Sequence, residues 1–193
     1  SETFTAASLG AAKAYTEGQE LNWAGKSDEA IAKYEEAIRL DPDMGRAYSG
    51  IAAQYQNTGR RADADRYYNE ALRRIDRMTD REKFRTRGGY FLFTGKSQEA
   101  VKEFTALVTA FPADMAGLSN LAFAHAQLRD FGKALELGRR AASIFPQNVL
   151  RRTNVALYGM YAGKFEEAIA DADAVLKIND RYMKAYIARA LWE

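Results

Sequence analysis

A repeat of 34 residues constrains the fold of this chain more than any other feature of its sequence. The twentieth residue of the repeat is alanine every time, and the eighth is glycine or alanine every time. Self-similarity at a period of about 20–50 residues is typical of architectures that stack one small unit several times. The 193-residue sequence divides into repeats at about residues 11–44, 45–78, 81–114, 115–148 and 149–182, followed by a partial repeat or capping helix at 183–193.

Each repeat is predicted to form two helices. In the first repeat, apolar side chains recur at helical spacing after Gly25, at Ala30, Ile31, Tyr34 and Ala37. A glycine at the fifteenth position, present in four of the five repeats, is predicted to end the first helix of each pair. Small residues at the eighth and twentieth positions are expected where the two helices approach most closely, because larger side chains there would push them apart.

Several polar residues predict where helices begin. Ser27 and Ser97 stand where an N-cap residue would start the second helix of the first and third repeats. Thr79, followed three residues later by Glu82, fits a capping box at the start of the third repeat. A proline closes repeats one, three and four, and it is expected to terminate the second helix there.

The composition excludes several classes of active site. The absence of cysteine rules out disulfides, thiolate nucleophiles and cysteine-based zinc sites. His125 is the only histidine, so clusters of histidine ligands and most histidine-based catalytic arrangements are excluded too. Its position in the repeat predicts an interior-facing side chain bonded to a neighbouring helix. The net charge of +2 indicates no general attraction to nucleic acid, and no apolar run approaches the roughly 18–20 residues of a membrane span.

The tripeptide Gly95-Lys96-Ser97 looks like the end of a phosphate-binding loop. Such a loop needs a glycine five residues before the Gly-Lys pair, and that residue is Tyr90, in an apolar stretch. The same tripeptide occurs at residues 25–27, in the same position of the repeat. A turn between helices explains both occurrences, and nucleotide binding is rejected.

Residues 60–87 form a basic stretch, with ten basic side chains against six acidic ones. Such an excess could receive an acidic peptide or a nucleic-acid backbone. The acidic residues are interleaved at spacings that suit ion pairs along a helix. A solvated helix face is therefore favoured over nucleic-acid binding.

Two helices per unit, the 34-residue period and the recurring glycine, alanine, aromatic and proline positions together resemble the tetratricopeptide repeat (TPR) family. The resemblance covers about residues 11–193. It implies an all-α fold, a right-handed superhelix of antiparallel helix pairs that forms a single array over residues 1–193, with the first helices lining a concave groove. Asp76 stands where the family has proline, which predicts that the second helix of repeat two runs from about Ala62 to Met78.

The resemblance also implies which residues face the groove. In the family, certain positions of each first helix tend to face the concavity, where amides can bond to a peptide backbone and apolar side chains can form pockets. The peptide-binding groove is expected to contain Tyr15, Gln19, Asn22, Ser49, Asn57, Arg85, Gly89, Phe93, Asn120, Phe123, Gln127, Asn154, Leu157 and Tyr161. Some family members clamp a C-terminal carboxylate with Lys and Asn, but Tyr15 and Gln19 stand at those positions, so such a clamp is not expected.

The expected function is a non-catalytic module that binds a peptide segment of a partner protein. We expect no cofactor, metal site or catalytic residue, no membrane insertion, and a cytoplasmic location. One alternative is a self-associating scaffold, homodimeric through the C-terminal helix. The stretch Asp76–Asp114 also resembles the TPR tails of bacterial Ser/Thr protein kinases of eukaryotic type, which gives a second alternative: a regulatory region of a kinase whose catalytic domain lies outside this sequence.

Overall fold

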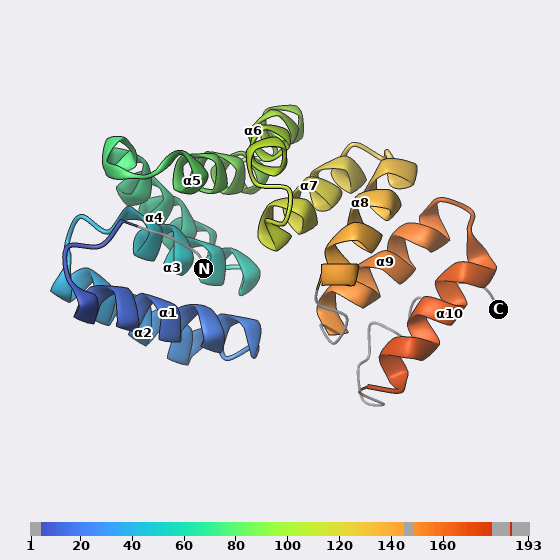
Figure 1. Cartoon of the computed structure of the whole chain (residues 1–193), viewed down its shortest axis with the longest axis horizontal. Helices are drawn as coiled ribbons and strands as arrows, with labels where there is room; N and C mark the ends of the chain where they lie inside the picture. Colours follow the sequence, from blue (N-terminus) through green and yellow to red (C-terminus); the bar gives the residue numbers. More distant parts are fainter. Residues whose placement is uncertain (1–4, 145–148, 179–185, 187–193) are drawn as a thin grey trace. The chain divides into compact units, whose positions relative to one another are not determined.

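The computed structural model describes residues 5–144, 149–178 and 186, and this part of the chain consists of helices and the turns between them (Figure 1). The chain forms two compact units, unit 1 (Ser1–Thr94) and unit 2 (Gly95–Glu193). The helices of unit 1 are α1 (Leu9–Trp23), α2 (Ser27–Leu40), α3 (Gly45–Asn57), α4 (Arg61–Arg73), the short 3₁₀ helix η1 (Ile75–Arg77) and α5 (Asp80–Phe93). The helices of unit 2 are α6 (Ser97–Ala110), α7 (Met115–Gln127), α8 (Phe131–Ile144), α9 (Val149–Tyr161) and α10 (Phe165–Leu176).

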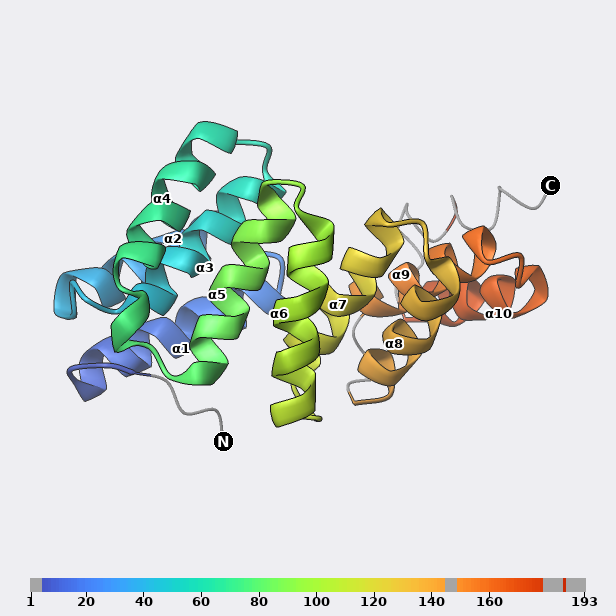
Figure 2. The same cartoon turned by 90° about the horizontal axis from the view of Figure 1, so that it is seen from above.

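The prediction of an all-α fold built from helix pairs is confirmed. Helix α1 packs against α2 and α3 against α4 in unit 1, and α7 packs against α8 and α9 against α10 in unit 2 (Figure 2). No helix in the described ranges is long and apolar enough to cross a bilayer. Apart from Tyr186, the predicted partial repeat at 183–193, and with it the helix proposed for a homodimer, lies outside the described residues.

Small residues lie where the paired helices meet, as predicted. In unit 1 the ring of Tyr34, on α2, fits between Gly18 of α1 and Gly50 of α3. A Cβ atom added to Gly18 would lie 2.7 Å from the ring, and one added to Gly50 would lie 2.9 Å from it. The alanines at the twentieth position of the five repeats are all 0% exposed: Ala30, Ala64, Ala100, Ala134 and Ala168.

Between α8 and α9 of unit 2, the large and the small side chain are on the opposite helices. Gly138, on the second helix α8, occupies the repeat position of Tyr34. Side chains of α9, the first helix of the next pair, fill the space beside Gly138. A Cβ atom added to Gly138 would lie 3.3 Å from Tyr158 and 3.3 Å from Val155, both on α9. At this contact the aromatic side chain therefore comes from the first helix α9 and the small residue from the second helix α8.

The first helix of a pair ends in a left-handed turn. Gly25, Gly59, Gly95 and Gly163 have φ angles of 77°, 77°, 74° and 73°, a conformation that glycine adopts without a steric penalty. Arg129 takes the same conformation with φ at 62°, at a cost of about 1–2 kcal/mol for a residue with a Cβ atom. Two of these turns hold the Gly-Lys-Ser tripeptides, so their backbone forms a helix end and not a phosphate-binding loop.

The predicted capping box and the proline stops of repeats one and three are confirmed, while the stop at Pro146 lies outside the described residues. The Glu82 N–H donates to the Thr79 hydroxyl at 3.3 Å, and the Thr79 N–H donates to the Glu82 carboxylate at 2.7 Å. Helix α2 ends at Leu40, two residues before the first proline of the sequence, and α6 ends in the same way at Ala110.

The predicted serine N-caps are wrong. Ser27 and Ser97 are the first residues of α2 and α6, and the N-cap residues are Lys26 and Lys96, without a capping side-chain bond. The glycine turn brings the backbone into position one residue earlier than the sequence pattern indicated. The hydroxyl of Ser97 is used elsewhere, since it donates to the side-chain oxygen of Gln127 at 2.7 Å.

The second helix of repeat two is shorter than predicted. Instead of running over Ala62–Met78, α4 ends at Arg73 and the chain continues as η1. The Arg74 guanidinium donates to the carbonyl oxygen of Glu70 at 2.8 Å, the acceptor that the Arg74 N–H would use in an α-helix. The Arg74 N–H instead bonds at 3.1 Å to the carbonyl three residues earlier. This tighter winding leads to Met78, which is 6% exposed.

His125 lies near the end of α7 and is partly buried. Its Nδ1 lies 3.1 Å from Oδ2 of Asp130, the residue that directly precedes the neighbouring helix α8 of the same pair. The other carboxylate oxygen of Asp130 accepts the N–H of Lys133 at 3.2 Å. The histidine therefore helps to hold the residue that caps α8.

Candidate functional site

Three of the predicted groove residues of unit 1 belong to its core. Tyr15 is 1% exposed, Ser49 is 5% exposed and Phe93 is 7% exposed. The ring centroids of Tyr15 and Tyr34 are 5.6 Å apart, and those of Phe93 and Tyr68 are 5.3 Å apart. Aromatic residues of the second helices cover Tyr15 and Phe93, and the Ser49 hydroxyl donates to the carbonyl oxygen of Arg46 at 3.0 Å, so none of the three belongs to an accessible surface.

The predicted amides of α1 are already bonded within unit 1. Gln19 donates through Nε2 to the Tyr15 hydroxyl at 3.0 Å, and Oδ1 of Asn22 accepts from Nε2 of the buried Gln54 at 2.7 Å. The first bond lies within α1 and the second joins α1 to α3. Fewer polar side-chain groups of α1 are therefore available to a partner protein. The other predicted residues of unit 1 are the exposed Asn57 on α3 and the partly buried Arg85 and Gly89 on α5.

The predicted amides of unit 2 differ from those of unit 1. Asn120 on α7 and Asn154 on α9 are both partly buried. Among the residues that the structure describes, neither side chain makes a hydrogen bond. A partly buried amide without a protein partner keeps two donors and an acceptor available for a bound chain.

Apolar side chains accompany these amides on the same two helices. Phe123 on α7 is 42% exposed, and Tyr161 at the end of α9 is 61% exposed. Leu157 is partly buried and packs on the small core cluster between α9 and α10. Gln127, the remaining predicted residue, accepts the hydrogen bond from Ser97. The aromatic pair thus offers apolar surface beside the two amides.

A small hollow between α7, α8 and α9 adjoins this face, and it is lined by Ser119, Ala122, Gly138, Ala141, Asn154 and Tyr158. None of these lining residues is charged at physiological pH, and burial raises the pKa of Tyr158 further, to about 12. The side chain of Asn154 therefore lies at an uncharged surface.

The sequence prediction missed aromatic residues at the start of the second helices of unit 2. The ring of Phe131, the first residue of α8, stacks on Tyr161 with the centroids 4.8 Å apart. Phe165, the first residue of α10, is 39% exposed. Both phenylalanines occupy the seventeenth position of their repeats, where the first three repeats have polar residues, and this change within the repeat is the signal that could have found them.

The basic stretch of unit 1 is paired, as its interleaved acids predicted. Arg60 lies 2.7 Å from Asp63, and Arg74 lies 2.7 Å from Glu70. The guanidinium of Arg60 also lies 4.3 Å from the ring centroid of Tyr55. Exposed ion pairs of this kind contribute only about 0–1 kcal/mol each, but they neutralise much of the local charge.

Charged groups also join two helices of unit 2. Arg139 on α8 lies 2.6 Å from Glu167 and 3.6 Å from Asp171, both on α10. Burial raises the pKa of the Asp171 carboxyl, while Arg139 opposes that rise. These ion pairs connect α8 to α10, and the three residues do not form the paired acid and base of a catalytic site.

Two family models match this chain. One, described as a tetratricopeptide repeat, matches residues 86–149, and the other, described as a TPR repeat, matches residues 18–59, so together they cover more than half of the sequence. The chain belongs to the tetratricopeptide repeat family. A curated relative of this TPR protein is Superkiller complex protein 3 of Homo sapiens, 27% identical over 99 residues, and the match spans 51% of the chain but 6% of the relative.

Solved structures with the same fold are also TPR proteins. TTC0263, a thermophilic TPR protein of Thermus thermophilus, matches with a TM-score of 0.70 and 15% identity, over 94% of this chain and 98% of that one. YrrB, described as a TPR protein with an unusual peptide-binding site, matches with a TM-score of 0.58 and 19% identity, over 93% of this chain and 92% of that one. At such identities the likeness shows the fold of this TPR chain.

Proposed function

We propose that this TPR chain is a non-catalytic interaction module that binds a peptide segment of a partner protein. The observation that carries the proposal is the contrast between the two sets of amides. Asn22 is bonded within unit 1, whereas Asn120 and Asn154 make no hydrogen bond in the described part of unit 2. These partly buried amides keep their donors and acceptors available, and a peptide backbone supplies the matching groups.

The apolar neighbours of these amides support the same function. Phe123 and Tyr161 offer exposed aromatic surface on α7 and α9, and the partly buried Phe131 of α8 stacks on Tyr161. Aromatic side chains commonly anchor a bound chain, while backbone hydrogen bonds fix its register. The proposed ligand is therefore a segment with apolar side chains, held through its main chain by the two asparagines.

The experiment selects peptides from a random library on the wild-type protein and measures their affinity by fluorescence anisotropy. The double variant Asn120→Ala/Asn154→Ala should bind about 30- to 150-fold more weakly, since each lost set of hydrogen bonds is worth about 1–1.5 kcal/mol. The matched control is Gln98→Ala/Thr105→Ala, at two exposed positions of α6.

Three outcomes would reject the proposal. One is a library that yields no binding peptide. Another is an asparagine variant that binds as tightly as the wild type, and the third is an equal loss in the α6 control. Circular dichroism of all variants shows whether the helices are retained.

A further inference from the structure

A short non-helical segment of the chain, Thr5–Ala7, is bound to one end of unit 1 by two acidic side chains. The Thr5 N–H and hydroxyl donate to Oε1 and Oε2 of Glu82, both at 3.0 Å. The Ala7 N–H donates to Oδ2 of Asp41 at 2.7 Å. Between them, Ala6 is partly buried and packs on the core of unit 1. Donors two residues apart on the same side are typical of an extended chain.

Each carboxylate is held in place by its own loop, independently of this segment. Oε2 of Glu82 accepts the Thr79 N–H at 2.7 Å and the Thr79 hydroxyl at 2.9 Å, within the capping box of α5. Oδ1 of Asp41, at the end of α2, accepts the Asp43 N–H at 3.1 Å. Oε1 of Glu82 and Oδ2 of Asp41 are then the acceptors that receive the N–H groups of the segment.

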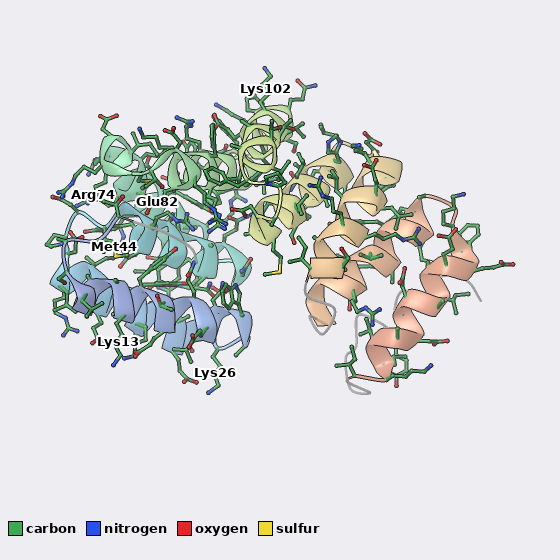
Figure 3. All side chains as sticks on the ribbon, viewed as in Figure 1. Lys13, Lys26, Met44, Arg74, Glu82 and Lys102 are labelled. Carbon is green, nitrogen blue, oxygen red and sulfur yellow. The ribbon has the colours of Figure 1, made fainter. Side chains whose placement is uncertain are left out.

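The side chains of both acceptors are buried when Thr5–Ala7 is bound. Glu82 is 4% exposed and Asp41 is 5% exposed. Figure 3 labels Glu82, on α5, among the side chains of unit 1. These exposures apply with Thr5–Ala7 bound; without it, both carboxylates keep the donors of their own loops, and Oε1 of Glu82 and Oδ2 of Asp41 can accept N–H groups from another extended chain. The two acceptors are preorganised, which lowers the cost of binding such a chain.

Apart from its three hydrogen bonds, the bound segment makes few apolar contacts with unit 1. Thr5 and Ala7 are exposed, and Ala6 is the only one of the three that packs on the core cluster. A segment with so few apolar contacts opens at low cost compared with the helices around it. Well-fixed acceptors with a weakly held occupant are the arrangement expected of a site that exchanges its ligand.

We propose that Asp41 and Glu82 form an exchangeable peptide site, occupied by Thr5–Ala7 until an extended segment of a partner protein replaces it. The replacing segment carries a serine or threonine, whose N–H and hydroxyl bond to Glu82, and a small residue after it. The next residue cannot be proline, because its N–H bonds to Asp41. A negative charge on the hydroxyl residue is excluded by the Glu82 carboxylate. This site is on unit 1 and does not depend on the proposed role of Asn120 and Asn154.

The test empties the site in the full-length chain. The variant Thr5→Val/Ala7→Pro removes the hydroxyl and one of the two N–H donors without altering either acceptor. A fluorescent peptide with the sequence of residues 1–8 is then titrated against the variant and the wild type. We expect at least ten-fold tighter binding to the variant, because the wild-type segment competes from within the chain at a high effective concentration.

Changes in the peptide separate this site from other surfaces without disturbing the fold. Peptides carrying valine or phosphothreonine in place of Thr5, or proline in place of Ala7, should each bind at least ten-fold more weakly to the emptied variant. Equal affinity of the variant and the wild type for the parent peptide would overturn the proposal, and so would equal binding of the valine peptide.

Light scattering distinguishes a partner protein from a second copy of this chain. We expect the wild type to be monomeric at the concentrations used for binding. A wild-type dimer that is lost in the Thr5→Val/Ala7→Pro variant would assign the site to exchange between copies and overturn the partner assignment. Failure of the asparagine variant in the library experiment would leave these results unchanged, so the two proposals fail separately.

Discussion

Replacing Gly18 by alanine should destabilise unit 1, although alanine favours the helical conformation more than glycine does. The added Cβ atom would lie 2.7 Å from both Cδ1 and Cε1 of Tyr34 and 3.3 Å from the carbonyl oxygen of Ala30. The ring cannot move away freely, because Gly50 of α3 also packs against it, and a Cβ atom at Gly50 would lie only 2.9 Å from the ring. Helices α1 and α2 must therefore separate, or the ring must leave its rotamer.

The size of the effect follows from two opposing contributions. Glycine to alanine within a helix gains about 0.8–1 kcal/mol, while overpacking a close-packed core costs about 1–3 kcal/mol. We expect a net loss of about 1 kcal/mol in the free energy of unfolding. The matched control is Gly132→Ala on α8, where an added Cβ atom would meet no atom within 4 Å, and where the same change should gain up to about 1 kcal/mol.

Urea denaturation followed by circular dichroism measures both substitutions, and a double-mutant cycle with Tyr34→Ala isolates the clash. In the Tyr34→Ala background the ring is absent, so Gly18→Ala should become stabilising, with a coupling of about 1–3 kcal/mol between the two sites. The reasoning is refuted if Gly18→Ala stabilises the wild type as much as Gly132→Ala does. It is also refuted if its effect has the same sign with and without Tyr34.

Two further predictions concern unit 2. Arg129→Gly should raise the free energy of unfolding by about 1 kcal/mol, because φ at Arg129 is 62°, whereas Gly163→Ala, at a φ of 73°, should lower it by a similar amount in the same urea assay. Opposite signs support the turn argument, and equal signs contradict it. Burial raises the pKa of Tyr158 to about 12 from an ordinary value near 10, so its contribution to stability is present below about pH 10 and is lost as pH rises through 12. Tyr158→Phe should remove this part of the pH dependence, and a Tyr158 that ionises near pH 10 in absorbance at 295 nm would contradict it.

Local signals in the sequence predicted most of the fold. The left-handed turns depend on one glycine each, and the capping box depends on Thr79 and Glu82, which are three residues apart. The errors arose where a distant or long side chain decides the outcome. Helix α4 ends early because the Arg74 side chain takes the carbonyl of Glu70, and no pattern of neighbouring residues indicates that bond.

The candidate surface was less predictable for the same reason. The repeat places residues on the first helices, but exposure depends on what the second helices carry. Tyr15 is covered because the ring of Tyr34 lies beside it, and Asn22 is bonded because Gln54 reaches it from another repeat. Burial and pairing of this kind depend on side chains of the facing helices, in the same repeat for Tyr34 and in the next repeat for Gln54, and the position of a residue within its own repeat does not predict them.

The reversal between Tyr34 and Gly138 limits how such an array can be rearranged. Repeats of equal length with the same turn look interchangeable, yet grafting repeat five behind repeat one would set Asn154 where Gly50 admits the ring of Tyr34. Grafting repeat two behind repeat four would leave Gly138 without the ring of Tyr158 that fills its space. The large and small side chains fit each other across the contact between two adjoining repeats. We therefore expect duplication or recombination of this gene to preserve that fit when two adjoining repeats move together.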